Sequence, residues 1–598
     1  MLETLIRAGN GVAEAADHVS IAIGNDALIA KVVTYRDELA KRRRTLIANP
    51  ALYDPEAAPE PWYTGPSEGD IFWPQLRATL EADSGWEAAV PALDAASTDI
   101  VGLLASPHNP VIRSRGLVLG HVQSGKTANF TATIAKAADA GYRLFIVLSG
   151  VHNALRRQTQ LRLDQQLNTP HPTRWLQLTD ETHDFGNPVK ALPLVAGTNL
   201  RLLAVVKKNV SRLTRLRDWL REAHKHGGLD TCPVLIIDDE SDQASVNSAK
   251  NAELDRTRIN ERIVELLGLP RVAYLGYTAT PFANVLVNPK DSKDIYPRNF
   301  IYPLEKPKTY FGSRELFGAK LSEDEITPEA EGHDMIREVD TVEAAQHSPK
   351  SVAESGARVT DAMGQAITWF VLATAARRVR TGQRGHSSML VHTTMRVDPQ
   401  LGYLSPIRTF VRTLADRLAQ GETEAVRTMW EAETLREPAS RHGLSPVTFA
   451  ELSEVVPEVL TELRVVADNS RATERLVYGD DPATVIAVGG NTLSRGLTLE
   501  GLVSSYFLRS STAYDSLLQM GRWFGYRPGY SDLPRIWTTS QLARDFEFLA
   551  DVEDSLRQEI ERYSNLDGAS PETLPVRIQM HPRLQATSRI KMQFAVQG

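Results

Sequence analysis

The chain has 598 residues, of which 42% are hydrophobic and 24% are charged, and its formal net charge is −7. At about 100–200 residues per domain, this predicts a globular protein of several domains. No apolar run of about 20 residues occurs, which argues against a membrane-spanning helix, and the start lacks the pattern of a secretory signal. The single cysteine, Cys232, excludes an internal disulfide and a cysteine-based metal site. We expect a soluble, cytoplasmic protein without a membrane partner. Its acidic balance argues mildly against a general nucleic-acid-binding module.

The first half of the chain changes its pattern near residue 106. Residues 1–105 are expected to form a helical region. Over 106–300, short apolar runs alternate with helical segments, which is typical of βαβ units and a parallel sheet. The strands expected in this first lobe are 117–119, 144–148, 202–206, 234–237 and 272–275.

The second half repeats the α/β pattern after an acidic stretch. Residues 301–380 are expected to form an acidic linker followed by a helix at 361–380. A second lobe is expected over 381–540, with strands at 388–392, 485–488 and 502–507 and a helical insertion at about 405–475. Residues 541–598 are expected to form a C-terminal region with one helix at 542–563. The predicted fold class is therefore α/β, with two parallel-sheet lobes.

The segment GHVQSGKT at residues 120–127 fits the phosphate-loop pattern G-x-x-x-x-G-K-[ST], between a predicted strand and a helical stretch. Glycine lets backbone N–H groups converge on phosphate oxygens, and a helix N-terminus adds partial positive charge. Lys126 is expected to bridge the β- and γ-phosphates of ATP, and Thr127 to hold Mg²⁺. The predicted nucleotide contacts of this loop are Gly120, Gln123, Ser124, Gly125, Lys126 and Thr127.

The predicted strand at 234–237 ends in the acidic run DDESD at 238–242. An α/β sheet places its functional site at the carboxyl ends of its strands. One carboxylate should hold Mg²⁺ and the next should orient and polarise the attacking water. Aligned as D-E-x-D, Asp239 is the metal residue and Glu240 the base. Asp238 is an alternative for the metal role because it follows the strand directly.

Three later segments complete a pattern: YTATP at 277–281, GNTLSRGLTL at 490–499 and QMGRWFGYR at 519–527. With the two earlier segments, they resemble motifs I, II, III, V and VI of superfamily II helicases. The resemblance implies RecA-like lobes, coupling of the lobes and nucleotide contact through Thr278 and Thr280, and a contact at Gly496. It also implies an arginine finger at Arg522, with Arg527 as second candidate. A cation at that place offsets charge that builds on the γ-phosphoryl group.

The segments GHVQSGKT, IIDDESDQAS, GYTATPFAN and QMGRWFGYRPGY together resemble the Z-one domain family, over roughly residues 110–598. This helicase-like bacterial family occurs near DNA methylases and nucleases in restriction-like and phage-defence gene clusters. The resemblance implies ATP-driven work on DNA, with nuclease and methylase partners. RNA is the alternative substrate.

Nucleic acid is expected across the faces of both lobes. Ser149 and Asn153 lie where a strand ends and a helix begins, and such a helix N-terminus can bind a backbone phosphate. Lys207 and Lys208 follow another predicted strand, and Thr393 follows a strand of the second lobe. For the aromatic residues at 523–530, packing around the finger is favoured over base stacking.

The leading hypothesis is a DNA-dependent ATPase or translocase that uses ATP and Mg²⁺. One rival is a nucleotide-switched scaffold that recruits nuclease or methylase partners without translocation, which the acidic net charge favours. Another is an endonuclease that carries its own motor, but the sequence has no strong nuclease signature. The histidines mostly stand alone, so the only expected metal ligands are Thr127 and Asp239.

Overall fold

The computed structural model describes most of the chain beyond residue 50. The described residues are 51–54, 62–83, 86–186, 191–196, 200–247, 257–287, 289, 294–307, 310–318, 332–469, 471–472, 476, 478–479, 481–490, 499–566, 569–574, 576, 578–579, 581 and 583–586, with seven isolated residues between 19 and 34. Within them, no helix is both long and apolar enough to cross a membrane.

The first lobe is built on an eight-stranded sheet in the order β1-β8-β2-β7-β6-β3-β5-β4. Every neighbouring pair is parallel except β1 with β8. The strands are β1 (Leu52–Tyr53), β2 (Arg113–Leu119), β3 (Leu144–Ser149), β4 (Trp175–Gln177), β5 (Arg201–Lys207), β6 (Val234–Asp239), β7 (Val272–Thr278) and β8 (Phe300–Pro303). The five strands predicted here are all present. The central strands are buried throughout, as parallel strands covered on both faces should be.

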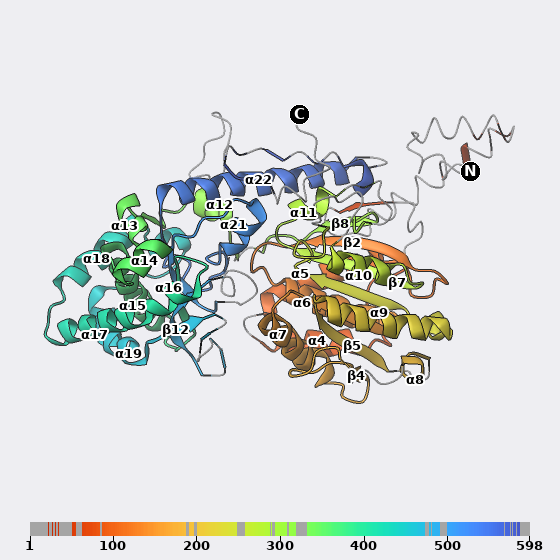
Figure 1. Ribbon diagram of the computed structural model, residues 1–598, viewed down its shortest axis with the longest axis horizontal. Coiled ribbons are helices and arrows are strands. Elements are labelled where there is room, and N and C mark those ends of the chain that lie inside the picture. The colour runs from red at the N-terminus through yellow and green to blue at the C-terminus, as the bar shows by residue number, and fades with distance from the viewer. Residues whose placement is uncertain are drawn as a thin grey trace.

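Helices cover both faces of this sheet (Figure 1). They are α4 (Phe72–Glu81), α5 (Val90–Leu103), α6 (Lys126–Asp139), α7 (Asn153–Leu163), α8 (Ala191–Ala196), α9 (Val210–Lys225), α10 (Arg258–Leu267) and α11 (Phe282–Val285). Helices α4 and α5 pack on α6, whose last residue, Asp139, accepts backbone N–H groups at the start of α4, including that of Trp73 at 2.9 Å. A carboxylate at a helix N-terminus satisfies N–H groups that have no partner within the helix. The region before residue 106 is therefore anchored to the helix that follows the phosphate loop.

The second lobe has a six-stranded sheet, in which every pair is parallel, in the order β10-β16-β14-β11-β13-β12. Its strands are β10 (Ile336–Glu338), β11 (Ser387–His392), β12 (Arg464–Asp468), β13 (Thr484–Gly489), β14 (Leu502–Phe507) and β16 (Arg535–Thr538). The buried helix α15 (Asp361–Thr381) packs against it. Three strands of this sheet were not predicted: β16 lies within the expected lobe, and the other two lie in segments for which another structure was expected. β10 lies inside the expected acidic linker, followed by α13 (Thr341–Gln346) and α14 (Pro349–Ser355), and β12 lies inside the expected helical insertion.

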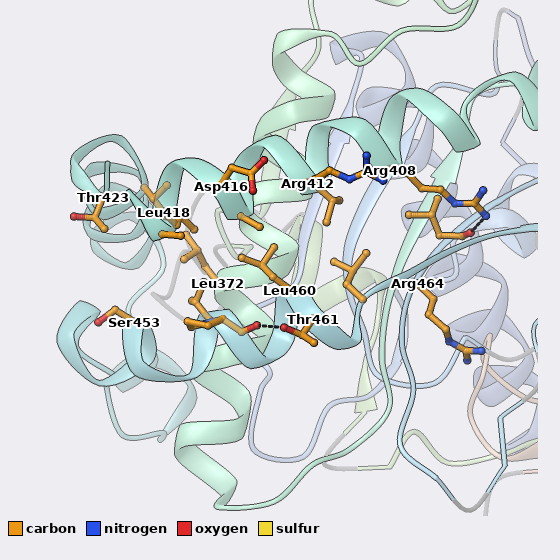
Figure 2. Close-up of a pocket in the computed structure, with 18 of the residues that line it drawn as sticks. Leu372, Arg408, Arg412, Asp416, Leu418, Thr423, Ser453, Leu460, Thr461 and Arg464 are labelled. Atoms are coloured by element: carbon orange, nitrogen blue, oxygen red, sulfur yellow. Dashed lines mark hydrogen bonds between the residues drawn. The ribbon is translucent and has the colours of Figure 1, made fainter. Parts of the chain in front are cut away.

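The helical insertion between β11 and β12 consists of α16 (Val397–Gly402), α17 (Leu404–Ala419), α18 (Glu424–Arg436) and α19 (Phe449–Glu462). A cavity of about 780 Å³ lies between α17 and α19, with mainly apolar walls and Arg408, Arg412 and Arg464 toward one end (Figure 2). This cavity is formed within the second lobe and shares no lining residue with the nucleotide motifs.

The two lobes share an apolar core beneath the C-terminal helix α22 (Ser540–Ser564), which runs across both of them in Figure 1. Leu549, Leu556 and Ile560 of α22 belong to one buried cluster with Leu117 and Leu119 of β2. The same cluster includes Leu517, Leu518 and Met520 of α21 (Tyr514–Met520), in the second lobe. Burial of this surface stabilises the closed arrangement that brings the motifs of the two lobes together.

Candidate nucleotide site between the lobes

The phosphate loop joins β2 to α6 in a conformation that its glycines permit. Gly125 has φ +86° and precedes the first residue of α6, and a Cβ at Gly120 would lie 2.5 Å from the Lys126 side chain. The loop is closed on itself: the Ser124 hydroxyl accepts the His121 N–H at 3.0 Å, and the Lys126 ammonium donates to the His121 carbonyl at 3.1 Å. A phosphate group would replace the carbonyl as partner of Lys126.

Adjacent residues at the end of β6 face opposite ways, because side chains alternate across a strand. Asp238 forms a fully buried ion pair with Lys208 at 2.6 Å and accepts the Tyr274 hydroxyl at 2.6 Å. Burial raises the pKa of Asp239, and the positive charge of Lys126 is the largest opposing influence. Asp239 is therefore the carboxylate that faces the phosphate loop. The alternative of Asp238 as the metal residue is wrong, since its oxygens are engaged on the other face.

Glu240 follows the strand in a left-handed conformation, with φ +54°. That conformation is uncommon for a residue with a Cβ and is often found at functional sites. Burial raises its pKa to about 7, against the opposing charges of Lys126 and Arg522. A carboxyl group with a pKa near neutrality is suited to accept a proton from water.

Asp242 is the centre of a hydrogen-bonded cluster that joins the lobes. It accepts the Thr278 hydroxyl at 2.9 Å and the Thr280 hydroxyl at 3.1 Å, both from the end of β7. From the second lobe, the Gln519 amide donates to Asp242 at 2.7 Å and to Thr280 at 2.9 Å. It also lies 3.3 Å from a carboxylate oxygen of Glu240. Both threonines are fully buried and bound to Asp242, and their contact with the nucleotide stays a prediction. They are placed to couple the lobes.

Arg522 follows α21 and is only 8% exposed. Burial lowers its pKa to about 10, and the charge of Glu240 is the largest opposing influence. The guanidinium remains charged at neutral pH and is electrostatically linked to the predicted base, across the junction between the lobes. This is where a finger residue is needed.

Arg527 has a different role from the one predicted. Its guanidinium is bound to backbone carbonyls of its own turn, those of Trp523 at 3.0 Å, Phe524 at 3.3 Å and Tyr526 at 2.7 Å. It is 5% exposed and holds the turn after Arg522. These bonds favour Arg522 over Arg527 as the finger, and the second-finger role of Arg527 stays a prediction. Trp523 and Phe524 are each 3% exposed, which favours packing over base stacking.

Three side chains hold the phosphate loop, and two of them, those of Tyr310 and Arg557, lie outside the sequence motifs. In the two-stranded ladder of β9 (Tyr310–Phe311) and β15 (Gly525–Tyr526), the Tyr310 hydroxyl donates to the Val122 carbonyl at 2.5 Å. The Tyr526 hydroxyl donates to the Ser124 carbonyl at 3.3 Å, and Arg557 of α22 donates to the Gly120 carbonyl at 2.7 Å. Tyr310 and Arg557 could not be found from the sequence, because no local pattern marks a residue whose partner lies about 190 or 440 positions away.

The predicted nucleic-acid contacts are only partly at the surface. Ser149 is 0% exposed and Lys208 is paired with Asp238, so in this structure neither presents a free surface group, and their contact with a phosphate stays a prediction. Asn153 is exposed at the start of α7 and accepts the Lys207 ammonium at 2.6 Å. Thr393 is half-buried after β11. Gly496 and the rest of 491–498 lie outside the described residues.

The protein-family match covers the part of the chain that contains Arg522, the predicted arginine finger. The family model of the Z1 domain matches residues 362–585. This confirms the predicted resemblance for that region, which includes Gln519 and Arg522. The phosphate loop and the acidic run lie ahead of the Z1 match. No curated protein matches the sequence.

Several solved structures are similar at low identity. One is the ATP-dependent Type ISP restriction-modification enzyme LlaBIII bound to DNA, at 12% identity over 81% of this chain and 30% of that one, with a TM-score of 0.38. Another is the DUF1998 helicase MrfA bound to DNA and AMPPNP, at 10% identity over 85% and 55%, with a TM-score of 0.39. A third is S. cerevisiae Dbp5 bound to RNA and ADP BeF3, at 14% identity over 82% and 96%, with a TM-score of 0.36. The chain thus spans under a third of LlaBIII.

Proposed function

We propose that this protein hydrolyses ATP between its two lobes and uses lobe movement to translocate along DNA. The observation that carries the proposal is the cluster around Asp242. Gln519, three residues before Arg522, is bonded to Glu240 and Asp242, the acidic residues that follow β6. Hydrolysis chemistry and lobe closure therefore depend on the same contacts.

The residues assign a role to each step. Lys126 and the N-terminus of α6 would bind the phosphates, and Thr127 and Asp239 supply the oxygen ligands that Mg²⁺ prefers. The fit is supported by the burial of Asp239 opposite Lys126, since a buried carboxylate gains from a cation beside it. When bound, Mg²⁺ would neutralise charge on the β- and γ-phosphates. Glu240 takes a proton from the attacking water, and Arg522 offsets charge on the γ-phosphoryl group.

Reopening of the lobes would follow loss of the γ-phosphate. In this arrangement, Gln519 of the second lobe is the hydrogen-bond partner of Asp242 and Thr280 of the first. These are bonds between a carboxylate, an amide and a hydroxyl, and each contributes only about 0.5–3 kcal/mol. Contacts of this strength can be exchanged in every cycle, which a motor requires.

The proposed substrate is DNA, with RNA as the alternative, and the proposed setting is a bacterial restriction or anti-phage system with nuclease and methylase partners. The resemblance to the Z1 domain over 362–585 supports this setting. Lys207 and Asn153, at the ends of β5 and β3, are the remaining surface candidates for phosphate contact in the first lobe.

Steady-state ATP hydrolysis, alone and with single- or double-stranded DNA or RNA, tests the proposal. We expect one nucleic acid to raise turnover several-fold and Lys126→Ala to abolish it. Hydrolysis that no nucleic acid alters would instead support a nucleotide-switched scaffold. The net charge of −7 and the burial of Lys208 favour that second candidate, because they reduce the cationic surface available to DNA.

A further inference from the structure

Two histidines and a glutamate from distant parts of the chain converge beside the second lobe. His333 lies just before β10, and Glu437 and His442 lie beyond α18, at and after its C-cap. The ligand atoms of the three side chains all lie within 4.8 Å of one another. The sequence analysis expected isolated histidines, since His333 is 104 residues from Glu437.

We propose that His333, Glu437 and His442 form a binding site for a divalent transition metal, with Zn²⁺ as the preferred ion. The carboxylate oxygen Oε1 of Glu437 lies 2.9 Å from Nδ1 of His333 and 3.0 Å from Nε2 of His442. Two imidazole nitrogens and one carboxylate oxygen, with a fourth position for water, are a frequent ligand set for Zn²⁺ in proteins.

The distances from Glu437 Oε1 to the two imidazole nitrogens require only a small adjustment. Tetrahedral ligands about 2.0–2.1 Å from a Zn²⁺ ion are roughly 3.3 Å apart, a few tenths of an ångström more than these two distances. The two rings are stacked, with centroids 4.3 Å apart, and His333 is 19% exposed. A small opening of the rings on the side of His333 would admit an ion and its water.

The other oxygen of Glu437 is held by the protein and fixes the carboxylate. Oε2 accepts the backbone N–H of Asp334 at 2.8 Å and lies 3.3 Å from the Arg441 guanidinium. Side chains that ligate metals are commonly oriented by such outer hydrogen bonds. The Glu437 side chain is 0% exposed, and the described partners of its Oε1 are the two imidazoles.

The local backbone explains why His442 reaches Glu437. The chain leaves α18 at Glu437, passes Pro438, and makes a single 3₁₀ turn at Ala439–His442 that ends at Gly443 in the left-handed region, φ +63°. This turn carries His442 back over the glutamate five positions earlier. His333 approaches from the other side, next to Phe311 of β9, whose ring centroid is 5.9 Å away.

A metal here would tie three segments together. It would link the approach to β10 with the helical insertion, close to the β9–β15 ladder that carries Tyr526 to the phosphate loop. None of its ligands belongs to the nucleotide site, and the inference does not depend on the proposed function. Mg²⁺ is disfavoured because it prefers oxygen ligands in octahedral geometry.

The test is metal binding by the full chain after chelator treatment, with Zn²⁺, Co²⁺ and Mg²⁺ as separate probes. We expect one equivalent of Zn²⁺ and a Co²⁺ visible spectrum of tetrahedral type. Loss of a ligand in His442→Ala or Glu437→Gln should weaken Zn²⁺ binding by more than about 100-fold, beyond the cost of losing an outer hydrogen bond. His226→Ala, an exposed histidine of the first lobe, is the matched control and should bind as the parent does.

Circular dichroism of each variant separates metal loss from unfolding. If His442→Ala is misfolded, His333→Ala supplies the same test from the partly exposed side of the cluster. Equal Zn²⁺ binding by the parent and a folded ligand variant would overturn the proposal, as would no binding by the parent. The cluster would then be a hydrogen-bonded ion pair of the insertion.

Discussion

Two buried carboxylates, Asp242 at the lobe junction and Glu433 in the second lobe, are satisfied in different ways. Asp242 accepts hydrogen bonds from two threonine hydroxyls and one glutamine amide. Glu433 is held by charged donors, with Arg337 Nε at 2.6 Å and Arg535 Nε at 2.7 Å. Burial opposes its ionisation, but Arg337 and Arg535 nevertheless lower its pKa.

The difference between neutral and charged donors indicates which of the two clusters can break and re-form during a cycle. A buried ion pair is costly to break, since each charge left behind is unpaired in a medium of low dielectric constant. Neutral donors can be exchanged for water at smaller cost. The Glu433 cluster therefore fixes the helical insertion to β10 and β16, whereas the Asp242 cluster can open and close.

The largest expected effect is the loss of ATP hydrolysis when Arg522, at the junction between the lobes, is substituted. Arg522→Ala should lower kcat by about 10³- to 10⁵-fold, because the lost cation acts on charge that builds in the transition state. Quench-flow or steady-state hydrolysis measures the loss, and Arg522→Lys should recover part of it. Normal turnover by folded Arg522→Ala would remove this residue from the chemistry.

Glu240→Gln should lower turnover by about 10²- to 10⁴-fold, the usual contribution of a general base. In the parent, kcat/KM should rise with pH through about 7, the region in which the Glu240 carboxyl loses its proton. A flat pH profile across that region, together with an active Gln variant, would show that another group accepts the proton.

The same substitution has a consequence for stability with a defined sign. The Glu240 carboxyl has its ordinary pKa of 4.5 in the unfolded chain and a pKa of about 7 in the folded protein. Between these two pH values the unfolded chain loses the proton while the folded protein keeps it, so the contribution of Glu240 to folding stability falls as pH rises from 4.5 to about 7. Glutamine removes this dependence. The stability of Glu240→Gln relative to the parent should therefore be higher at pH 8 than at pH 5, as measured by denaturant unfolding.

At the fixed cluster, Glu433→Gln should act on stability alone. Arg535 would keep its charge in a buried place without the Glu433 carboxylate, and Arg337 would keep only Asp334, at 3.0 Å; breaking such a buried pair typically costs about 3–5 kcal/mol. Chemical denaturation measures the loss, and ATP turnover per folded molecule should be unchanged. A fall in turnover without a fall in stability would mean that the insertion takes part in the cycle.

Local sequence patterns predicted the strands and the phosphate loop because their information lies within about 20 residues. The direction of Asp238 could not be predicted, since it depends on Lys208, whose side chain reaches back from the loop after β5. Arg527 fitted a family motif, but the carbonyl groups that bind it are set by the turn itself. Charged residues in similar sequence contexts thus differ in burial, and burial is decided by the three-dimensional packing.

The smallest expected effects come from substituting Lys207 and Lys208, which are adjacent in sequence but differ in burial. Lys207 lies partly exposed and bonds Asn153, whereas the Lys208 side chain is 0% exposed. Under the proposed function, Lys207→Ala should weaken DNA binding a few-fold and lower the salt dependence by about one ion, as loss of one phosphate contact does. Lys208→Met should leave the salt dependence of DNA binding unchanged and instead lower stability, because Asp238 would lose its charged partner.

Fluorescence anisotropy at several salt concentrations distinguishes the effects of these two substitutions. An unchanged slope for Lys207→Ala would place the phosphate contacts elsewhere on the first lobe, while a changed slope for folded Lys208→Met would mean that the acidic strand end rearranges when DNA binds.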